Sequence, residues 1–106
     1  PEGVMRDPVI RVLRPAEAEL LETEMEVART RGTEESSALA DRIASIATRL
    51  SGEPVAHLLH ARALYDAERY DEAIAAAERA RAVDAGNVRA TGLIAMARLR
   101  AEGGLD

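Results

Sequence analysis

Apolar residues recur every three or four positions along most of this chain, which is the spacing of one face of an α-helix. Prolines and glycines interrupt this pattern and divide the chain into segments. We predict five helices, near residues 15–31, 33–50, 54–67, 70–84 and 87–102, after an irregular segment over residues 1–14. Only "VIRVL", residues 9–13, alternates with a period of two, so no strands are expected.

Most of the predicted helix boundaries have a backbone reason. Pro15 and Pro54 suit the first position of a helix, where the missing N–H is not needed. Gly32 can end the first helix in a left-handed conformation, and Thr33 can cap the second. The break near "DAERYD", residues 66–71, carries neither Gly nor Pro, so a single helix over residues 54–83 is an open alternative.

The apolar positions also predict which faces are buried. The first helix presents a stripe of Leu21, Met25 and Ala28. The second presents a larger face made of Leu39, Ile43, Ile46, Ala47 and Leu50. Much of the 47% hydrophobic content is alanine, and the chain has no Phe or Trp. We therefore expect a core built by close approach of small-faced helices.

Length and charge exclude several classes of protein. At 106 residues the chain has room for one domain, here the helical residues 15–106. The net charge of −5 argues against general binding of nucleic acids or anionic membranes, which requires basic surface. No apolar run approaches the roughly 20 residues of a membrane span. We therefore expect a soluble protein, and a cytoplasmic one in preference to an exported one.

Alanines recur along the chain at a nearly constant spacing. The sets are Ala28, Ala61 and Ala95; Ala40 and Ala73; and Ala47 and Ala80. In each set the alanines fall on corresponding helices of successive predicted helix pairs. Their spacing is close to the period of about 34 residues that is typical of repeats built from two helices.

The segment from Pro54 to Asn87 resembles a tetratricopeptide repeat, a helix-turn-helix unit of about 34 residues. The residues that carry the resemblance are Leu58, Leu59, Ala61 and Leu64 in the first helix, "YDEAI" at the start of the second, and then Ala80 and "AVDAGN". Glu68 stands where the family usually has a turn glycine, and His57 and His60 where it has large apolar residues.

The resemblance implies an all-α fold, a short right-handed solenoid of about two and a half repeats. It implies that residues from Leu21 to about Glu53 form a degenerate repeat, and that the last helix, from Val88 to Glu102, closes the array. An ordinary up-and-down helical bundle is the alternative fold.

The resemblance also implies a concave groove, lined by the first helix of each repeat, that holds a peptide. The candidate groove residues are Met25, Arg29, Val55, Leu58, Arg62, Tyr65, Arg89 and Met96. Arg29 and Arg62 fall one repeat apart and could form a ladder for the carboxylates of an acidic peptide. Alternatively, a second subunit or the chain's own "VIRVL" segment fills the groove.

Candidates for chemistry are few. His57 and His60, with Glu53 one turn earlier, are the only residues that could imitate a metal site, and they lack a clear third ligand. We favour both histidines as packing residues, and expect no cofactor and no catalytic residue. The predicted function is non-catalytic protein or peptide binding; the alternatives are a homo-oligomerisation domain, such as a homodimer, and last a metal-dependent enzyme.

Overall fold

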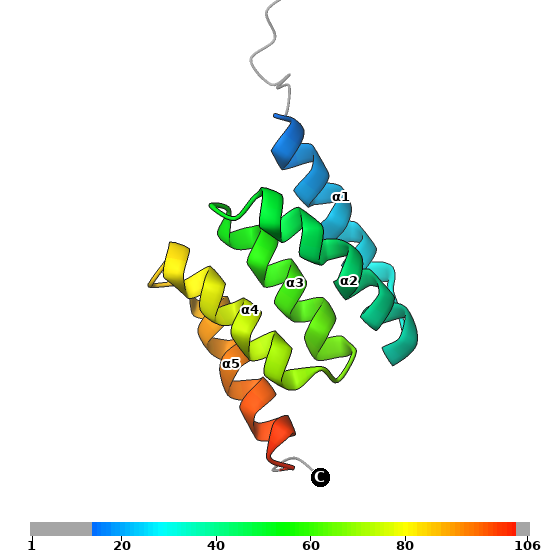
Figure 1. Cartoon of the computed structure of the whole chain (residues 1–106), viewed down its shortest axis with the longest axis vertical. Helices are drawn as coiled ribbons and strands as arrows, with labels where there is room; N and C mark the ends of the chain where they lie inside the picture. The colour runs from blue at the N-terminus through cyan, green and yellow to red at the C-terminus, as the bar shows by residue number, and fades with distance from the viewer. Residues whose placement is uncertain (1–13, 104–106) are drawn as a thin grey trace, which may run out of the picture.

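The computed structural model describes residues 14–103 and shows five α-helices joined by short loops (Figure 1). They are α1 (Pro15–Arg29), α2 (Thr33–Arg49), α3 (Pro54–Asp66), α4 (Tyr70–Val83) and α5 (Val88–Ala101). Each helix runs antiparallel to the one before it (Figure 1). The prediction of an all-α chain is confirmed for the described residues, and the helix boundaries lie within two residues of the predicted ones.

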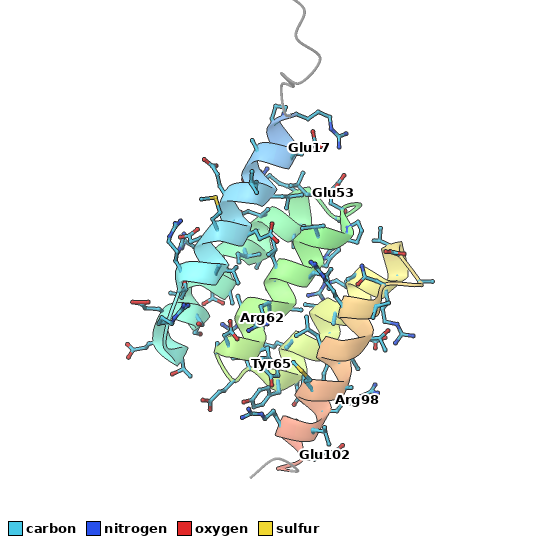
Figure 2. All side chains as sticks on the ribbon, turned by 180° about the vertical axis from the view of Figure 1, so that it is seen from behind. Glu17, Glu53, Arg62, Tyr65, Arg98 and Glu102 are labelled. Atoms are coloured by element: carbon cyan, nitrogen blue, oxygen red, sulfur yellow. The ribbon has the colours of Figure 1, made fainter. Side chains whose placement is uncertain are left out.

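The helices form two layers. Helices α2 and α4 lie in front in Figure 1, and the view from behind shows α1, α3 and α5 side by side (Figure 2). Helix α3 occupies the centre and contacts all four other helices. Among the described residues, no helix is long and apolar enough to cross a lipid bilayer.

Alanine dominates the core, as the composition predicts. Eleven of the eighteen buried apolar side chains in residues 14–103 are alanines, so the helices approach one another closely. The largest side chains with almost no exposure are Leu39, Ile43 and Leu64.

The buried face of α1 differs from the prediction. Leu20 and Thr23 are buried, whereas Leu21 and Met25 are 49% and 51% exposed. The predicted stripe of Leu21, Met25 and Ala28 is therefore wrong as a buried face, since Ala28 is exposed as well. Helix α1 is rotated by about one residue, roughly 100°, relative to the expectation.

Polar contacts with α2 accompany this rotation. Arg49 and Arg42 of α2 pair with Glu19 and Glu26 of α1, at N–O distances of 2.6 and 2.8 Å. The two carboxylates are seven residues apart and so share one face of α1. Thr23 can be buried beside them because its hydroxyl donates a hydrogen bond of 2.7 Å to the Glu19 carbonyl oxygen.

Helix α3 ends without a glycine. Glu68 adopts a left-handed conformation with φ 62°. Its N–H donates to the Tyr65 carbonyl oxygen at 3.0 Å, and the Arg69 N–H donates to the Leu64 carbonyl oxygen at 2.9 Å. These two bonds form a Schellman motif, which satisfies the last carbonyls of the helix. The alternative of one helix over residues 54–83 is therefore wrong.

Arg69 anchors this turn to α2. Its Nη1 donates to Asp41 Oδ1 at 2.9 Å and to Ser37 Oγ at 3.0 Å. Its Nε and Nη2 donate to the two carboxylate oxygens of Glu72, at 2.9 and 2.8 Å. This network ties the start of α4 to α2 across the end of α3, and so supports the tight turn at Glu68.

Replacing Glu68 by glycine should stabilise the protein. A non-glycine residue in the left-handed region destabilises the folded state by about 1–2 kcal/mol, and glycine removes this cost. About half of the gain is offset, because glycine gives the unfolded chain more conformational entropy. We expect the free energy of unfolding to rise by about 0.5–1 kcal/mol, measured by urea denaturation. Ala67→Gly is the matched control, since Ala67 has φ −84°, and it should lower stability. A loss of stability in both variants would contradict the strain at Glu68.

The start of α2 also differs from the prediction. Gly32 is the N-cap of α2, with φ 88° and ψ 151°, a conformation that is essentially restricted to glycine. Thr33 is the first residue of the helix and not its cap. Gly32 therefore sets the direction in which the chain enters α2, in place of ending α1 as predicted.

Candidate functional site

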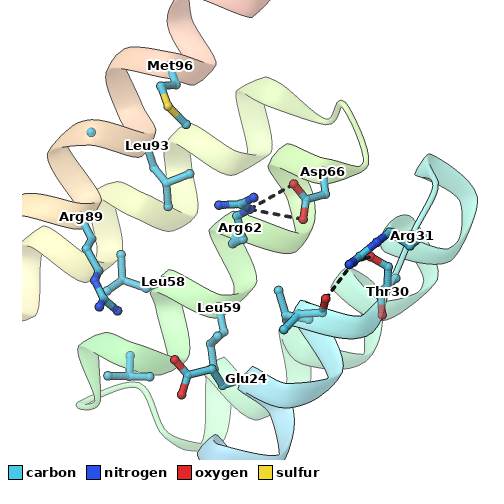
Figure 3. Close-up of a pocket in the computed structure, with 14 residues that line it drawn as sticks. Glu24, Thr30, Arg31, Leu58, Leu59, Arg62, Asp66, Arg89, Leu93 and Met96 are labelled. Carbon is cyan, nitrogen blue, oxygen red and sulfur yellow. Dashed lines mark hydrogen bonds and ion pairs between the residues drawn. The ribbon is translucent and has the colours of Figure 1, made fainter.

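An open groove of about 820 Å³ lies between α1, α3 and α5 (Figure 3). This volume falls in the range of ligand-binding clefts, about 300–1,000 Å³. It follows α3 from Val55 to Asp66, a length of about 16 Å. The lining residues are Glu24, Val27, Ala28, Thr30, Arg31, Val55, Leu58, Leu59, Arg62, Asp66, Arg89, Gly92, Leu93 and Met96.

The floor of the groove is apolar. Leu58 and Leu59 of α3 are nearly buried in it, with Leu93 of α5 beside them (Figure 3). Val55 and Met96 are 43% and 39% exposed, so two further apolar side chains of the lining face the solvent. Covering such apolar surface with a ligand is favourable by roughly 25 cal/mol per Å².

Gly92 widens the groove on the α5 side. It lies in the middle of α5 and its backbone lines the groove. A Cβ atom added there would meet no other atom within 4 Å, so the space above Gly92 is open. Glycine inside a helix costs roughly 0.5–1 kcal/mol relative to alanine, and no close packing at this position requires it. We call this open space the Gly92 notch.

Two of the three arginines that line the groove are already engaged. The Arg62 Nε donates to both carboxylate oxygens of Asp66, at 3.1 and 3.3 Å. The Arg31 Nη1 donates to the carbonyl oxygens of Ala28 and Thr30, at 2.7 and 3.0 Å, at the end of α1. Both side chains therefore have local partners at the end of the groove near Asp66.

Arg89 and Glu24 are the charged lining residues that have no hydrogen-bond or ion-pair partner among the described residues. Arg89 lies beside Leu58 on the α5 side, and Glu24 lies beside Leu59 on the α1 side (Figure 3). The apolar floor thus separates a free cation on one wall from a free anion on the other.

Five of the eight predicted groove residues line the groove: Val55, Leu58, Arg62, Arg89 and Met96. Met25 and Arg29 are exposed outside it. Tyr65 packs edge-to-face against Tyr70, with ring centroids 5.6 Å apart, and so joins the end of α3 to the start of α4. The expected ladder of Arg29 and Arg62 does not form in the groove.

The residues missed on α1 follow from its rotation. Glu24 and Val27 of α1, and Arg31 of the loop that follows it, line the groove at spacings of three and four residues. This stripe is as regular as the predicted one, but only one of its members is strongly apolar. Periodicity in hydrophobicity alone therefore selects the wrong face of α1. Residues 9–13, the other predicted occupant of the groove, lie outside the described residues.

The two histidines of α3 lie away from the groove lining. His57 is 4% exposed, and its Nε2 donates to the Ser51 carbonyl oxygen at 2.8 Å, so the backbone already holds this ring. Its Nδ1 and that of His60 are buried without a hydrogen-bond partner. Within residues 14–103, no three His, Asp or Glu side chains gather closely enough to form a metal site.

His60 should make stability depend on pH. Burial lowers the pKa of His60 below its usual 6.5, and the positive charges of Arg79, His57 and Arg69 lower it further, against the opposing effect of Glu72. The unfolded chain therefore binds a proton on His60 at a higher pH than the folded chain does. This contribution to stability is fully present above about pH 6.5 and is lost as the pH falls below that value.

The measurement is urea denaturation at pH 7.5 and pH 5.5, for the wild type and for His60→Gln. Glutamine does not titrate, so we expect the variant to lose less stability between the two pH values. All other titratable groups are common to both proteins. An equal loss in both would show that His60 does not contribute to the pH dependence.

Comparisons of the chain with protein-family models, with curated proteins and with solved structures give no match. A function for this protein is therefore inferred from the geometry and the chemistry of the groove.

Proposed function

We propose that this chain is a non-catalytic protein-interaction module that holds a peptide segment of a partner in the groove between α1, α3 and α5. The observation that carries the proposal is a groove about 16 Å long with an apolar floor, beside which the apolar side chains of Val55 and Met96 remain exposed to solvent. An elongated, open groove of this kind suits a stretch of polypeptide, because successive side chains can contact the floor.

A repeat in the groove lining supports this proposal. Four positions of α3 recur one repeat length later on α5, and all eight residues line the groove: Val55 and Arg89, Leu58 and Gly92, Leu59 and Leu93, Arg62 and Met96. Helices α3 and α5 thus present equivalent faces to the same space. We infer from this that the chain is a short array of tetratricopeptide-like repeats, in which α1, α3 and α5 are the groove helices.

Helices α2 and α4 also support the interpretation of the chain as an array of two-helix repeats. Three buried positions of α2 recur one repeat length later as buried positions of α4: Ala40 and Ala73, Ile43 and Ala76, Ala47 and Ala80. The set of alanines on the groove helices does not follow this rule, since Ala61 is buried whereas Ala28 and Ala95 are exposed. Equivalent burial on α2 and α4, together with equivalent lining positions on α3 and α5, is the pattern of a two-helix repeat.

The lining of the groove favours binding over catalysis. None of its described residues is a His, Ser, Cys, Lys or Tyr, and of its two carboxylates, which can also transfer protons, Asp66 is already paired with Arg62. The hydroxyl of Thr30 donates a hydrogen bond of 2.7 Å to the Glu26 carbonyl oxygen. The described lining of the groove therefore offers no activated nucleophile for catalysis.

The test is selection from a displayed library of random peptides, followed by affinity measurements on Gly92→Leu. Leucine fills the Gly92 notch, so we expect selected peptides to bind this variant about tenfold more weakly or worse. Because leucine is a better helix former than glycine, the thermal midpoint of the variant should not fall. Loss of binding and loss of stability are thereby separated.

Ala95→Leu is the matched control, since it adds a leucine to an exposed position of α5 outside the groove lining. It should bind the selected peptides as the wild type does. If Gly92→Leu also retains full affinity, the groove is not the binding site and the proposed function is wrong.

A further inference from the structure

We propose that the groove recognises an amphipathic helix whose apolar face has an acidic side chain on one flank and a basic side chain on the other. This inference rests on the proposed function, because it names the ligand chemistry of the same groove. Arg89 on the α5 wall pairs with the acidic flank, and Glu24 on the α1 wall pairs with the basic flank.

The floor requires an apolar face on the ligand. The groove length of about 16 Å corresponds to about three turns of helix, or roughly eleven residues. A helix of this length presents apolar side chains at positions i, i+3, i+4 and i+7 along one face. These side chains cover Leu58, Leu59 and Leu93, and one large side chain can enter the Gly92 notch.

The two charged walls favour a helix over an extended segment. A helix can place side chains on both flanks of its apolar face at the same level, where they meet the two walls. In an extended segment successive side chains point alternately to the floor and to the solvent, so few of them face the walls. Arg89 and Glu24 lie on opposite sides of α3 beside adjacent leucines, which is the arrangement that a helix can satisfy (Figure 3).

The charges expected on the ligand follow from the charged side chains of the groove that have no partner within the protein. Arg62 is paired with Asp66, and Arg31 bonds to backbone carbonyls, so neither offers an unengaged cation. Arg89 and Glu24 have no such partner among the described residues. Arg89 can hold a carboxylate through a bidentate contact, and Glu24 can accept from an ammonium or guanidinium group.

This arrangement disfavours a uniformly charged ligand. A second acidic flank would lie against Glu24, and a second basic flank would lie against Arg89. The chain's net charge of −5 adds a weaker, screened repulsion for acidic peptides. The proposed ligand thus differs from the acidic peptide expected from the sequence in having balanced charge.

The test uses three synthetic helical peptides with the same leucine face and with blocked ends. Their two flanks carry Glu and Lys, Glu and Glu, or Lys and Lys, and binding is measured by fluorescence anisotropy. The wild type should bind the Glu and Lys peptide tightest, by about threefold to tenfold over either other peptide. Glu24→Arg should bind the Glu and Glu peptide tightest, and Arg89→Glu the Lys and Lys peptide.

Glu22→Arg and Arg29→Glu are the matched controls, because both positions are exposed residues of α1 outside the groove lining. They make the same changes in net charge, and both should keep the wild-type order of affinities. The inference is overturned if none of the peptides binds, if the order is unchanged in Glu24→Arg and Arg89→Glu, or if the controls change it equally.

Gly92→Leu separates this inference from the proposed function. Peptides that lose affinity for Gly92→Leu but show no dependence on their flank charges would leave the groove as the binding site and overturn only its charge preference. Peptides that bind Gly92→Leu as tightly as the wild type would overturn both.

Discussion

Replacing Leu64 by alanine is expected to lower the free energy of unfolding by about 2–5 kcal/mol. Leu64 is 1% exposed and lies on α3, the helix that contacts all the others. Its removal leaves a cavity, because a core made largely of alanine has few side-chain atoms that can move into the space. Since domains of this size are stable by about 5–15 kcal/mol, the loss is a large fraction of the total.

Urea denaturation followed by circular dichroism measures this loss. Leu99→Ala is the matched control, because it makes the same chemical change at a side chain that is 46% exposed. It should cost less than about 1 kcal/mol. Equal losses at the two positions would show that Leu64 is not part of the packed core.

Enlarging a core alanine should also be strongly destabilising. Ala77 of α4 is 0% exposed, and a leucine there adds three carbon atoms between closely packed helices. We expect a loss of about 1–3 kcal/mol. The measurement is the urea midpoint, together with the thermal midpoint, of Ala77→Leu.

Ala75→Leu is the control on the same helix, since Ala75 is exposed. Alanine and leucine have similar helix propensities, so its stability should change by less than about 0.5 kcal/mol. If Ala77→Leu were tolerated as well as Ala75→Leu, the small side chains would not set the distance between the helices.

The groove differs from the core in how it uses small residues. Buried alanines such as Ala77 allow helices to approach, whereas Gly92 opens space that no protein atom fills. Leu58 lines the same groove from α3, so a position in this lining does not by itself require a glycine. A residue that costs helix stability at a groove position fits a role in ligand binding.

Much of the local structure could be predicted from the sequence. Pro15 and Pro54 begin helices as expected, and Leu39 and Ile43 are buried as expected. The end of α3 is the boundary that the sequence marks least, because Glu68 takes the left-handed position that glycine usually occupies. The network around Arg69 supports this turn through contacts with residues far earlier in the chain, on α2, which no local pattern reveals.

The candidate site could be predicted only in part. Most groove residues of α3 and α5 are predictable, because Val55, Leu58 and Arg62 on α3 follow helical spacing, as do Arg89 and Met96 on α5. The groove residues of α1 are not predicted correctly, because the apolar stripe of Leu21 and Met25 lies on an exposed face of the helix outside the groove. The pairing of Arg62 with its own Asp66 was also missed, although the two residues are one turn apart.

The sequence by itself determined the helices, most of their breaks and the small-residue character of the core, because these depend on local backbone energetics and on periodicity. Only the tertiary structure decided the rotation of α1 and which charges of the groove are free. The rotation buries Leu20 and Thr23 and accompanies the pairing of Glu19 with Arg49, which lies on the next helix. Such contacts are chosen by the packing of whole helices, and so hydrophobic periodicity within one helix does not specify them.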